Sequence, residues 1–181
     1  QIDTSQNQQH AYLIADCDKP EILKKITEDQ LQKNIVHILI NNSGGPSSGA
    51  ITEASEDDFL TAFNRHLICN HILAKAAIPS MKKENYGRII NIISTSVKVP
   101  LKNLGVSNTI RGAVASWAKT MANELGQFNI TVNNILPGAT LTHRLENILQ
   151  KIILAKSITI EEGEKEMLKE IPMKRLGKAS E

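Results

Sequence analysis

The segment GRIINIIS, residues 87–94, is an almost uninterrupted apolar run that ends in serine. A strand with one solvated face alternates apolar and polar residues, whereas a strand covered on both faces is apolar throughout. The run therefore predicts a strand inside a parallel sheet. Three further runs have the same character, namely HAYLIAD (10–16), VHILINN (36–42) and ITVNNILPG (130–138).

Segments with helical periodicity separate these runs. Helices are predicted over 18–33, with Asp18 as the N-cap, over 55–81 and over 105–125. Strands that alternate with helices predict right-handed crossovers and helices on both faces of the sheet. Residues 144–170 form a last amphipathic helical stretch without a strand. No repeat or linker divides the chain, so we predict a single α/β domain over residues 1–181.

Composition narrows the classes of function. Twenty-one basic and 19 acidic residues give a formal net charge of +2, too small to predict binding to nucleic acid or to an anionic membrane. No apolar run approaches the ~20 residues that span a bilayer. Cys17 and Cys69 lack a CxxC pattern, so we expect no metal site. No signal-peptide pattern follows Gln1, and we predict a cytoplasmic protein.

Polar residues gather where the predicted strands end. Asp16 ends the first run, and residues 41–45, 94–96 and 137–140 end the other three. The carboxyl ends of parallel strands share one edge of the sheet, which is where ligands bind in open α/β folds. Four such segments at one edge predict a binding site.

The order and spacing of these segments resemble the short-chain dehydrogenase/reductase family. NNSGG (41–45) is similar to its Asn-Asn-Ala-Gly motif, GRIINIIS (87–94) to the strand with its catalytic serine, and ITVNNILPGATLT (130–142) to its Pro-Gly motif. IPMKRLGK (171–178) resembles the segment after the substrate lid in the 3-oxoacyl-acyl-carrier-protein reductase branch. The likeness implies a doubly wound, Rossmann-type sheet. The family's glycine-rich turn, first two strands and last strand have no counterpart here, so we expect a partial domain.

The resemblance implies NAD or NADP as cofactor, with residues 143–170 as a helical lid over the substrate. Asp16 would approach the adenine, residues 42–44 the adenosine ribose, and residues 137–142 the nicotinamide. The implied cofactor-binding residues are Asp16, Asn42, Ser43, Gly44, Arg111, Pro137, Gly138, Thr140 and Thr142. Two alternatives stay open, because Asp16 could be a turn or capping residue and Asn41 and Asn42 could be ties between neighbouring strands. The family's residues that discriminate between NAD and NADP follow its second strand, which has no counterpart in this sequence.

The catalytic positions depart from the family pattern. In the family a tyrosine stands thirteen residues after the serine and a lysine four residues later. The same count from Ser94 reaches Ser107 and Arg111, which share one face of a helix. The family's helix asparagine corresponds to His66. Ser94 alone keeps its usual identity.

These replacements change the available chemistry. A serine hydroxyl is a far weaker acid than a tyrosine, whose unperturbed pKa is about 10. Ser107 is therefore a poor proton donor. Arg111 stays protonated, but its planar donors can hold ribose hydroxyls or an oxyanion. An unperturbed histidine side chain titrates near neutrality. His66 is therefore the candidate acid or base, unless it is only a satisfied polar residue of its helix.

Two functions from different classes follow. The first is an NAD(P)-dependent oxidoreductase with a rebuilt proton-transfer site, acting on a small carbonyl or alcohol substrate. The second is a non-catalytic relative that binds a nucleotide or a partner subunit. The retained Ser94 and the Pro-Gly-x-Thr segment beside Arg111 favour the first.

Two helical segments, 57–78 and 107–125, are apolar around most of their circumference. The family pairs the equivalent helices across a two-fold axis, which implies a homodimer or homotetramer. The implied contact residues are Phe63, Leu67, Trp117 and Met121. The alternative is that these side chains fill the core beneath each helix.

Overall fold

The computed structural model describes residues 5, 7, 9–31, 34–169 and 171–181. Its main sheet has three parallel strands in the order β1-β2-β3, which are β1 (Ile38–Asn41), β2 (Gly87–Ile92) and β3 (Ile130–Ile135). Each strand lies inside a run predicted from the sequence. The α/β class with a parallel sheet is confirmed.

Helices occupy most of the remaining described chain. Short 3-10 turns lie at η1 (Ile51–Glu53), η3 (Thr95–Val97) and η4 (Gly126–Phe128). The longer helical elements are α1 (Pro20–Leu31), α2 (Glu56–Phe63), the π-helical turn η2 (Asn64–Ile68), α3 (Cys69–Lys83), α4 (Gly105–Leu125), α5 (His143–Lys156) and α6 (Ile160–Leu168).

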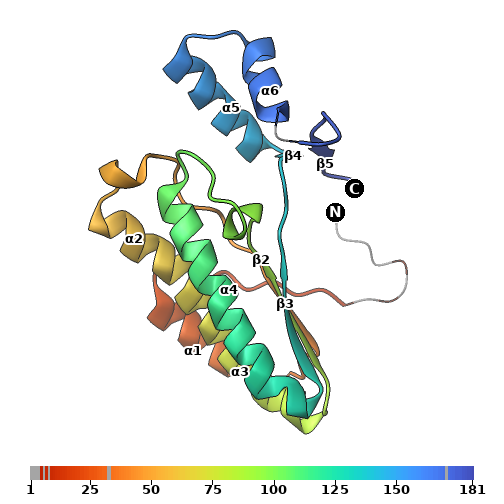
Figure 1. Ribbon diagram of the computed structural model, residues 1–181. Coiled ribbons are helices and arrows are strands. Elements are labelled where there is room, and N and C mark those ends of the chain that lie inside the picture. The colour runs from red at the N-terminus through yellow and green to blue at the C-terminus, as the bar shows by residue number, and fades with distance from the viewer. Residues whose placement is uncertain (1–4, 6, 8, 32–33, 170) are drawn as a thin grey trace.

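The core lies between the sheet and helices α3 and α4. Helices α1 to α4 all lie on one side of the sheet (Figure 1). The buried core residues are Ala74, Ala77 and Met81 of α3, Ile89, Ile130 and Val132 of the sheet, and Ala118, Met121 and Leu125 of α4. The opposite face of the sheet exposes Ile38 and Ile40, by 56% and 59%. Helices on both faces were expected, but in the described residues they cover one face only.

Residues 10–16 do not form the predicted strand. Tyr12 and Ile14 are 87% and 85% exposed, and no described strand pairs with this segment. An apolar run becomes a strand only where a neighbour completes its backbone hydrogen bonds. The N-cap prediction is also wrong, because α1 begins at Pro20 and the Asp18 carboxylate accepts hydrogen bonds from Nε and Nη2 of Arg65.

The predicted helix over 55–81 is divided by the π-helical turn η2. Its start is as expected, because Ser55 and Asp58 form a reciprocal capping box. The wider turn of η2 carries Arg65 and His66, which reach two different segments of the chain. Such turns are frequent at functional sites.

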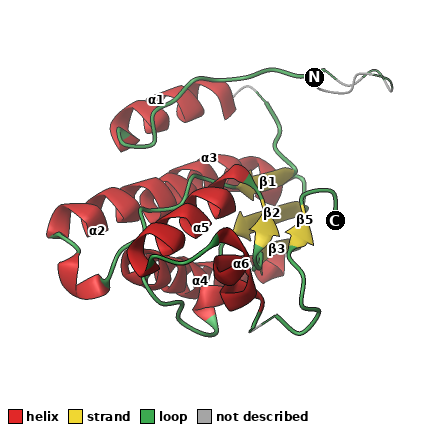
Figure 2. Cartoon of the chain, turned by 90° about the horizontal axis from the view of Figure 1, so that it is seen from above, coloured by secondary structure: helices red, strands yellow, loops and turns green. Residues whose placement is uncertain are grey.

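The stretch predicted as helical over 144–170 is a pair of helices. The chain reverses at Ser157, which has φ +51°. Gly163 of α6 packs closely on α5, where an added Cβ would lie 3.0 Å from Leu149 Cδ1. A two-stranded parallel ladder, β4 (Thr140–Leu141) with β5 (Gly177–Lys178), lies beside this pair. Viewed from above, α5 and α6 project over α4 and the ends of the sheet (Figure 2).

Candidate functional site

Three asparagines stand in register at the carboxyl ends of the three strands. Asn41 Nδ2 donates to Asn91 Oδ1 at 2.8 Å, and Asn91 Nδ2 donates to Asn134 Oδ1 at 3.0 Å. Asn91 is completely buried, so these bonds form in a region of low dielectric where an unpaired amide is costly. The ladder fixes the strand ends and the loops that follow them. Asn41 is therefore a tie between strands, which the sequence had left open.

Arg111 connects helix α4 to the end of β2. Its Nη1 donates to the carbonyl oxygen of Ile92 at 2.8 Å, and the residue is only 9% exposed. Ser107, one turn earlier on the same face, is 7% exposed. The predicted pair is thus held inside the molecule rather than on a solvated helix face.

Glycine sets the position of α4 against the loop after β1. A Cβ on Gly105 would lie 2.7 Å from Ile51 Cα, closer than any side chain permits. Gly49 N donates to Asn103 O at 2.8 Å, and Gly49 forms a parallel bridge with Leu104. The loop that carries residues 42–44 is therefore tied to the start of the helix that carries Ser107 and Arg111.

Ser94 lies two residues beyond the carbonyl that binds Arg111. It is the N-cap of η3, and its half-buried hydroxyl accepts a hydrogen bond from Ser96 N at 3.1 Å. The end of β2 thus brings Ser94 and Arg111 to the same place in the fold.

His66 is 1% exposed, and its Nδ1 lies 2.7 Å from the hydroxyl of Ser43. The turn that carries it, η2, also contacts α4. Sequence reasoning placed these two residues in separate roles and missed the bond between them. The only signal was that both depart from the family pattern, Ser43 from an alanine and His66 from an asparagine.

The other predicted cofactor residues are exposed or half-buried. Asp16 Oδ1 accepts from Asp18 N at 2.9 Å, so Asp16 also serves as a turn residue. Pro137, Gly138 and Thr142 are exposed, and Thr140 is half-buried in the ladder with Gly177. Their contacts to a cofactor stay a prediction.

Two side chains near η2, those of Asp18 and Cys69, have shifted pKa values. Hydrogen bonding to Arg65 lowers the pKa of the Asp18 carboxyl below its ordinary value. Burial, reinforced by the adjacent Cys17, raises the pKa of the Cys69 thiol to about 12, and Cys69 Sγ donates to Cys17 O at 3.3 Å. These contacts attach the segment before α1 to η2 and to the start of α3.

A surface cavity of about 530 Å³ opens on α4 beside this site, between the helix and the loop after η3. Its polar lining includes Ser96, Asn108 and Thr109. Within the described ranges, no cluster of three or more His, Cys, Asp or Glu side chains could hold a metal ion, and no helix is long and apolar enough to span a membrane.

Comparison with known proteins identifies the family. The model of the short chain dehydrogenases matches residues 1–152. The NADPH-dependent reductase BacG of Bacillus subtilis is 30% identical over 144 residues, which are 80% of this chain and 56% of that protein. The 3-oxoacyl-[acyl-carrier-protein] reductase FabG of Buchnera aphidicola is 32% identical over 166 residues, 91% of this chain and 63% of that protein. The predicted likeness to the 3-oxoacyl reductase branch is thereby confirmed.

The structural likeness agrees with the sequence. The crystal structure of YwfH, an NADPH-dependent reductase involved in bacilysin biosynthesis, superposes with a TM-score of 0.82 at 27% identity. The superposition covers 92% of this chain and 65% of YwfH. The chain spans 56 to 63% of the two curated relatives. It belongs to the short-chain dehydrogenase family.

Proposed function

We propose that the protein is an NAD(P)-dependent oxidoreductase that interconverts a carbonyl and a hydroxyl group of a small molecule. The observation that carries the proposal is the buried Arg111, fixed by the Ile92 carbonyl beside Ser94 and one turn from Ser107. A cation in this position suits a reaction that develops negative charge on an oxygen. The relatives described as NADPH-dependent reductases support the same reaction class.

Two glycines of the predicted cofactor site are open to their surroundings. A Cβ added to Gly44 or to Gly138 would meet no atom within 4 Å, so open space lies beside both backbones. Asn42 is exposed next to Gly44, and its amide can bond ribose hydroxyls. These residues, with Asp16, Pro137, Thr140 and Thr142, would hold NAD or NADP.

Reduction of a carbonyl needs a hydride, which the bound nicotinamide supplies, and a proton on the oxygen. Arg111 carries five N–H donors in a rigid plane and stays charged, so it stabilises the oxyanion and orients the ribose. Ser94 provides a second donor to the oxygen. Ser107 fills part of the space of a tyrosine ring, and His66 is the group that exchanges the proton.

We place the substrate lid at α5 and α6, within residues 143–170. The pair projects over the strand ends (Figure 2), and Lys151 Nζ donates to Ser48 Oγ at 3.2 Å in the loop after β1. We also propose a cytoplasmic location, which the free thiols of Cys17 and Cys69 support.

Cofactor binding is tested by titration with NADH and NADPH, followed by nicotinamide fluorescence. We expect a saturable change, and we expect Gly44→Val to abolish it, because the new side chain enters the space proposed for the ligand, where an added Cβ meets no protein atom within 4 Å. Gly126→Val is the matched control, since a Cβ there also meets no atom but lies at the end of α4. A signal that does not saturate at millimolar cofactor would contradict the proposal.

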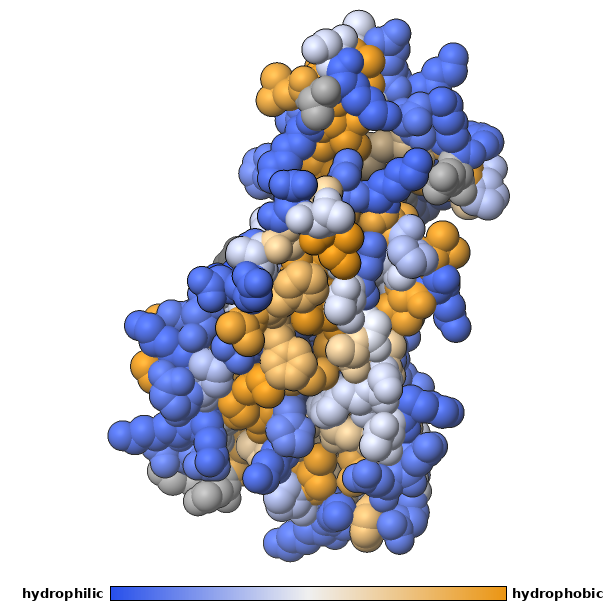
Figure 3. Space-filling view, turned by 60° about the vertical axis from the view of Figure 1, so that its left-hand side comes forward, coloured by the Kyte–Doolittle hydropathy of each residue, from blue (hydrophilic) through white to orange (hydrophobic). Residues whose placement is uncertain are grey.

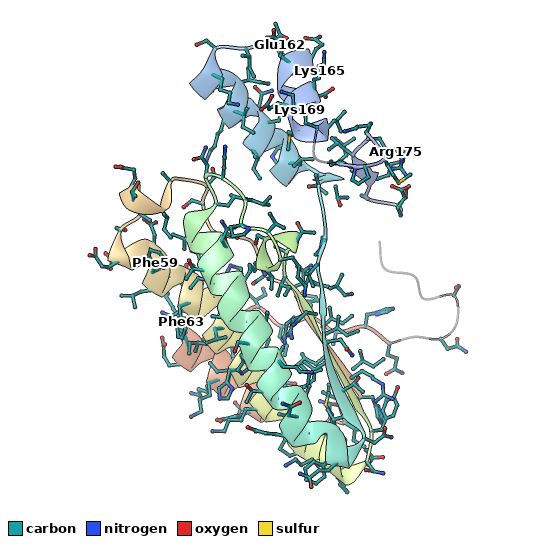
Figure 4. All side chains as sticks on the ribbon, viewed as in Figure 1. Phe59, Phe63, Glu162, Lys165, Lys169 and Arg175 are labelled. Atoms are coloured by element: carbon teal, nitrogen blue, oxygen red, sulfur yellow. The ribbon has the colours of Figure 1, made fainter. Side chains whose placement is uncertain are left out.

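We further propose a homodimer or homotetramer built on α2, α3 and α4. Apolar side chains gather across this face (Figure 3), where Phe63 is 37% exposed and Trp117 half-buried. Phe59 and Phe63 both project from α2 (Figure 4), and Phe59 packs toward α4. Met121 belongs to the hydrophobic core instead, which agrees with the alternative that these side chains fill the core beneath each helix.

Sedimentation velocity at micromolar concentration tests the assembly. We expect a dimer or larger species for the native protein and a shift toward monomer for Phe63→Glu, because a charge on this face opposes its burial. Leu154→Glu is the control, since Leu154 is also exposed (77%) but lies on α5. A native protein that sediments as a monomer contradicts the prediction.

A further inference from the structure

The hydrogen bond between Ser43 and His66 joins two separate elements at the candidate site. Ser43 lies in the loop after β1, and His66 lies in the π-helical turn η2, 23 residues later. The Oγ–Nδ1 distance is 2.7 Å, typical of a well-formed bond to a hydroxyl. His66 is 1% exposed, so little solvent competes for this contact.

Both partners are held in place by their neighbours. The loop of Ser43 begins at Asn41, which is bonded to Asn91, and is tied at Gly49 to the start of α4. The turn of His66 is held on one side by the bidentate pair of Arg65 with Asp18. The serine and the imidazole therefore meet because two rigid supports bring them together, rather than through the mobility of either side chain.

A serine hydroxyl is suited to a histidine that exchanges a proton. The hydroxyl can donate to Nδ1 when that nitrogen carries a lone pair, and it can accept when the nitrogen carries a proton. It thus keeps its bond to either neutral tautomer and to the imidazolium. A carboxylate in its place would favour the charged ring, and an alanine would leave the ring without this support.

We propose that Ser43 is a positioning residue for His66, which holds the imidazole at Nδ1 and retains it through a change of protonation state. This deepens the proposed function, because it rests on His66 as the proton-transfer group. It also reassigns Ser43 from a cofactor ligand to a support for the acid or base. The two departures from the family pattern, serine for alanine at position 43 and histidine for asparagine at position 66, then form one coupled change.

The test uses the ring ¹⁵N resonances of His66 in uniformly labelled protein, assigned by their loss in His66→Asn. We expect Ser43→Ala to shift the Nδ1 resonance and alter the tautomer populations, while Ser43→Thr, which keeps the hydroxyl, restores the native spectrum. Ser48→Ala is the control, because Ser48 lies in the same loop but bonds Lys151. Unchanged His66 resonances in Ser43→Ala would overturn the proposal.

Kinetics separate this inference from the proposed function. We expect kcat of Ser43→Ala to fall by up to about 10²-fold, the cost of a misplaced reacting group, with the Kd for NADPH unchanged. A raised Kd with an unaltered His66 spectrum would restore Ser43 to cofactor binding and refute the positioning role. An altered spectrum with undiminished kcat would uphold the positioning role and remove His66 from the proposed chemistry.

Discussion

Arg111→Ala is expected to lower kcat by on the order of 10²–10³-fold, the usual effect of deleting one donor to a developing oxyanion. Arg111 is the buried cation of the site, and its bond to the Ile92 carbonyl fixes the guanidinium at the end of β2. Alanine removes the charge and the planar donors together. The measurement is the loss of NAD(P)H absorbance with a panel of aldehydes and ketones.

Arg88→Ala is the matched control for this experiment. Arg88 also donates to backbone carbonyls, those of Gly87 and Asn129, but at the opposite end of the same strand. We expect near-native turnover from it. Arg111→Lys should fall between the two, because lysine keeps the charge without the planar donors. Native turnover in Arg111→Ala would show that the guanidinium takes no part in the reaction.

Asn91→Ala is expected to reduce the free energy of unfolding by about 2–6 kcal/mol, because it leaves the buried amide of Asn41 and the half-buried amide of Asn134 without their Asn91 partner, at about 1–3 kcal/mol each. Asn91 is the central member of the ladder, bonded to Asn41 on one side and Asn134 on the other. Urea denaturation followed by circular dichroism measures the change.

Asn133→Ala supplies the comparison on the neighbouring strand. Asn133 is exposed on β3, where its amide bonds Thr131 at 3.3 Å, so its loss should cost within about 0.5 kcal/mol. Equal destabilisation by the two variants would show that the ladder contributes nothing beyond an ordinary surface contact.

The sheet could be predicted from the sequence because each strand has a local signal. The runs 36–42, 87–94 and 130–138 contain β1, β2 and β3, and each strand is shorter than its run. Residues 10–16 carry an equal signal but lie outside the sheet. Composition cannot reveal whether a neighbouring strand is present.

The site was predictable only as far as helix spacing and strand ends determine it. The four-residue interval placed Ser107 and Arg111 on one face, and both are buried there. The partner of Arg111 is a carbonyl 19 residues away, and the partner of His66 is a hydroxyl 23 residues away. Neither contact has a local signature, because each forms only when separate elements pack together.

The π-helical turn η2 escaped prediction for the same reason. Its sequence, NRHLI, continues the apolar periodicity of the helix on either side. What distinguishes the turn is the pairing of Arg65 with Asp18 and of His66 with Ser43, two segments that precede it in the chain. The local sequence alone therefore predicts one continuous helix.

One comparison tests most directly whether a catalytically active site is formed by Ser94, Ser107, Arg111 and His66. Turnover of NAD(P)H with the carbonyl panel is measured for the native protein and for the double variant Ser107→Tyr with Arg111→Lys, which restores the family's usual residues. We expect the native protein to turn over and the double variant to be no faster. A native protein that is inert, beside a double variant that is active, would contradict the claim and identify a non-catalytic relative.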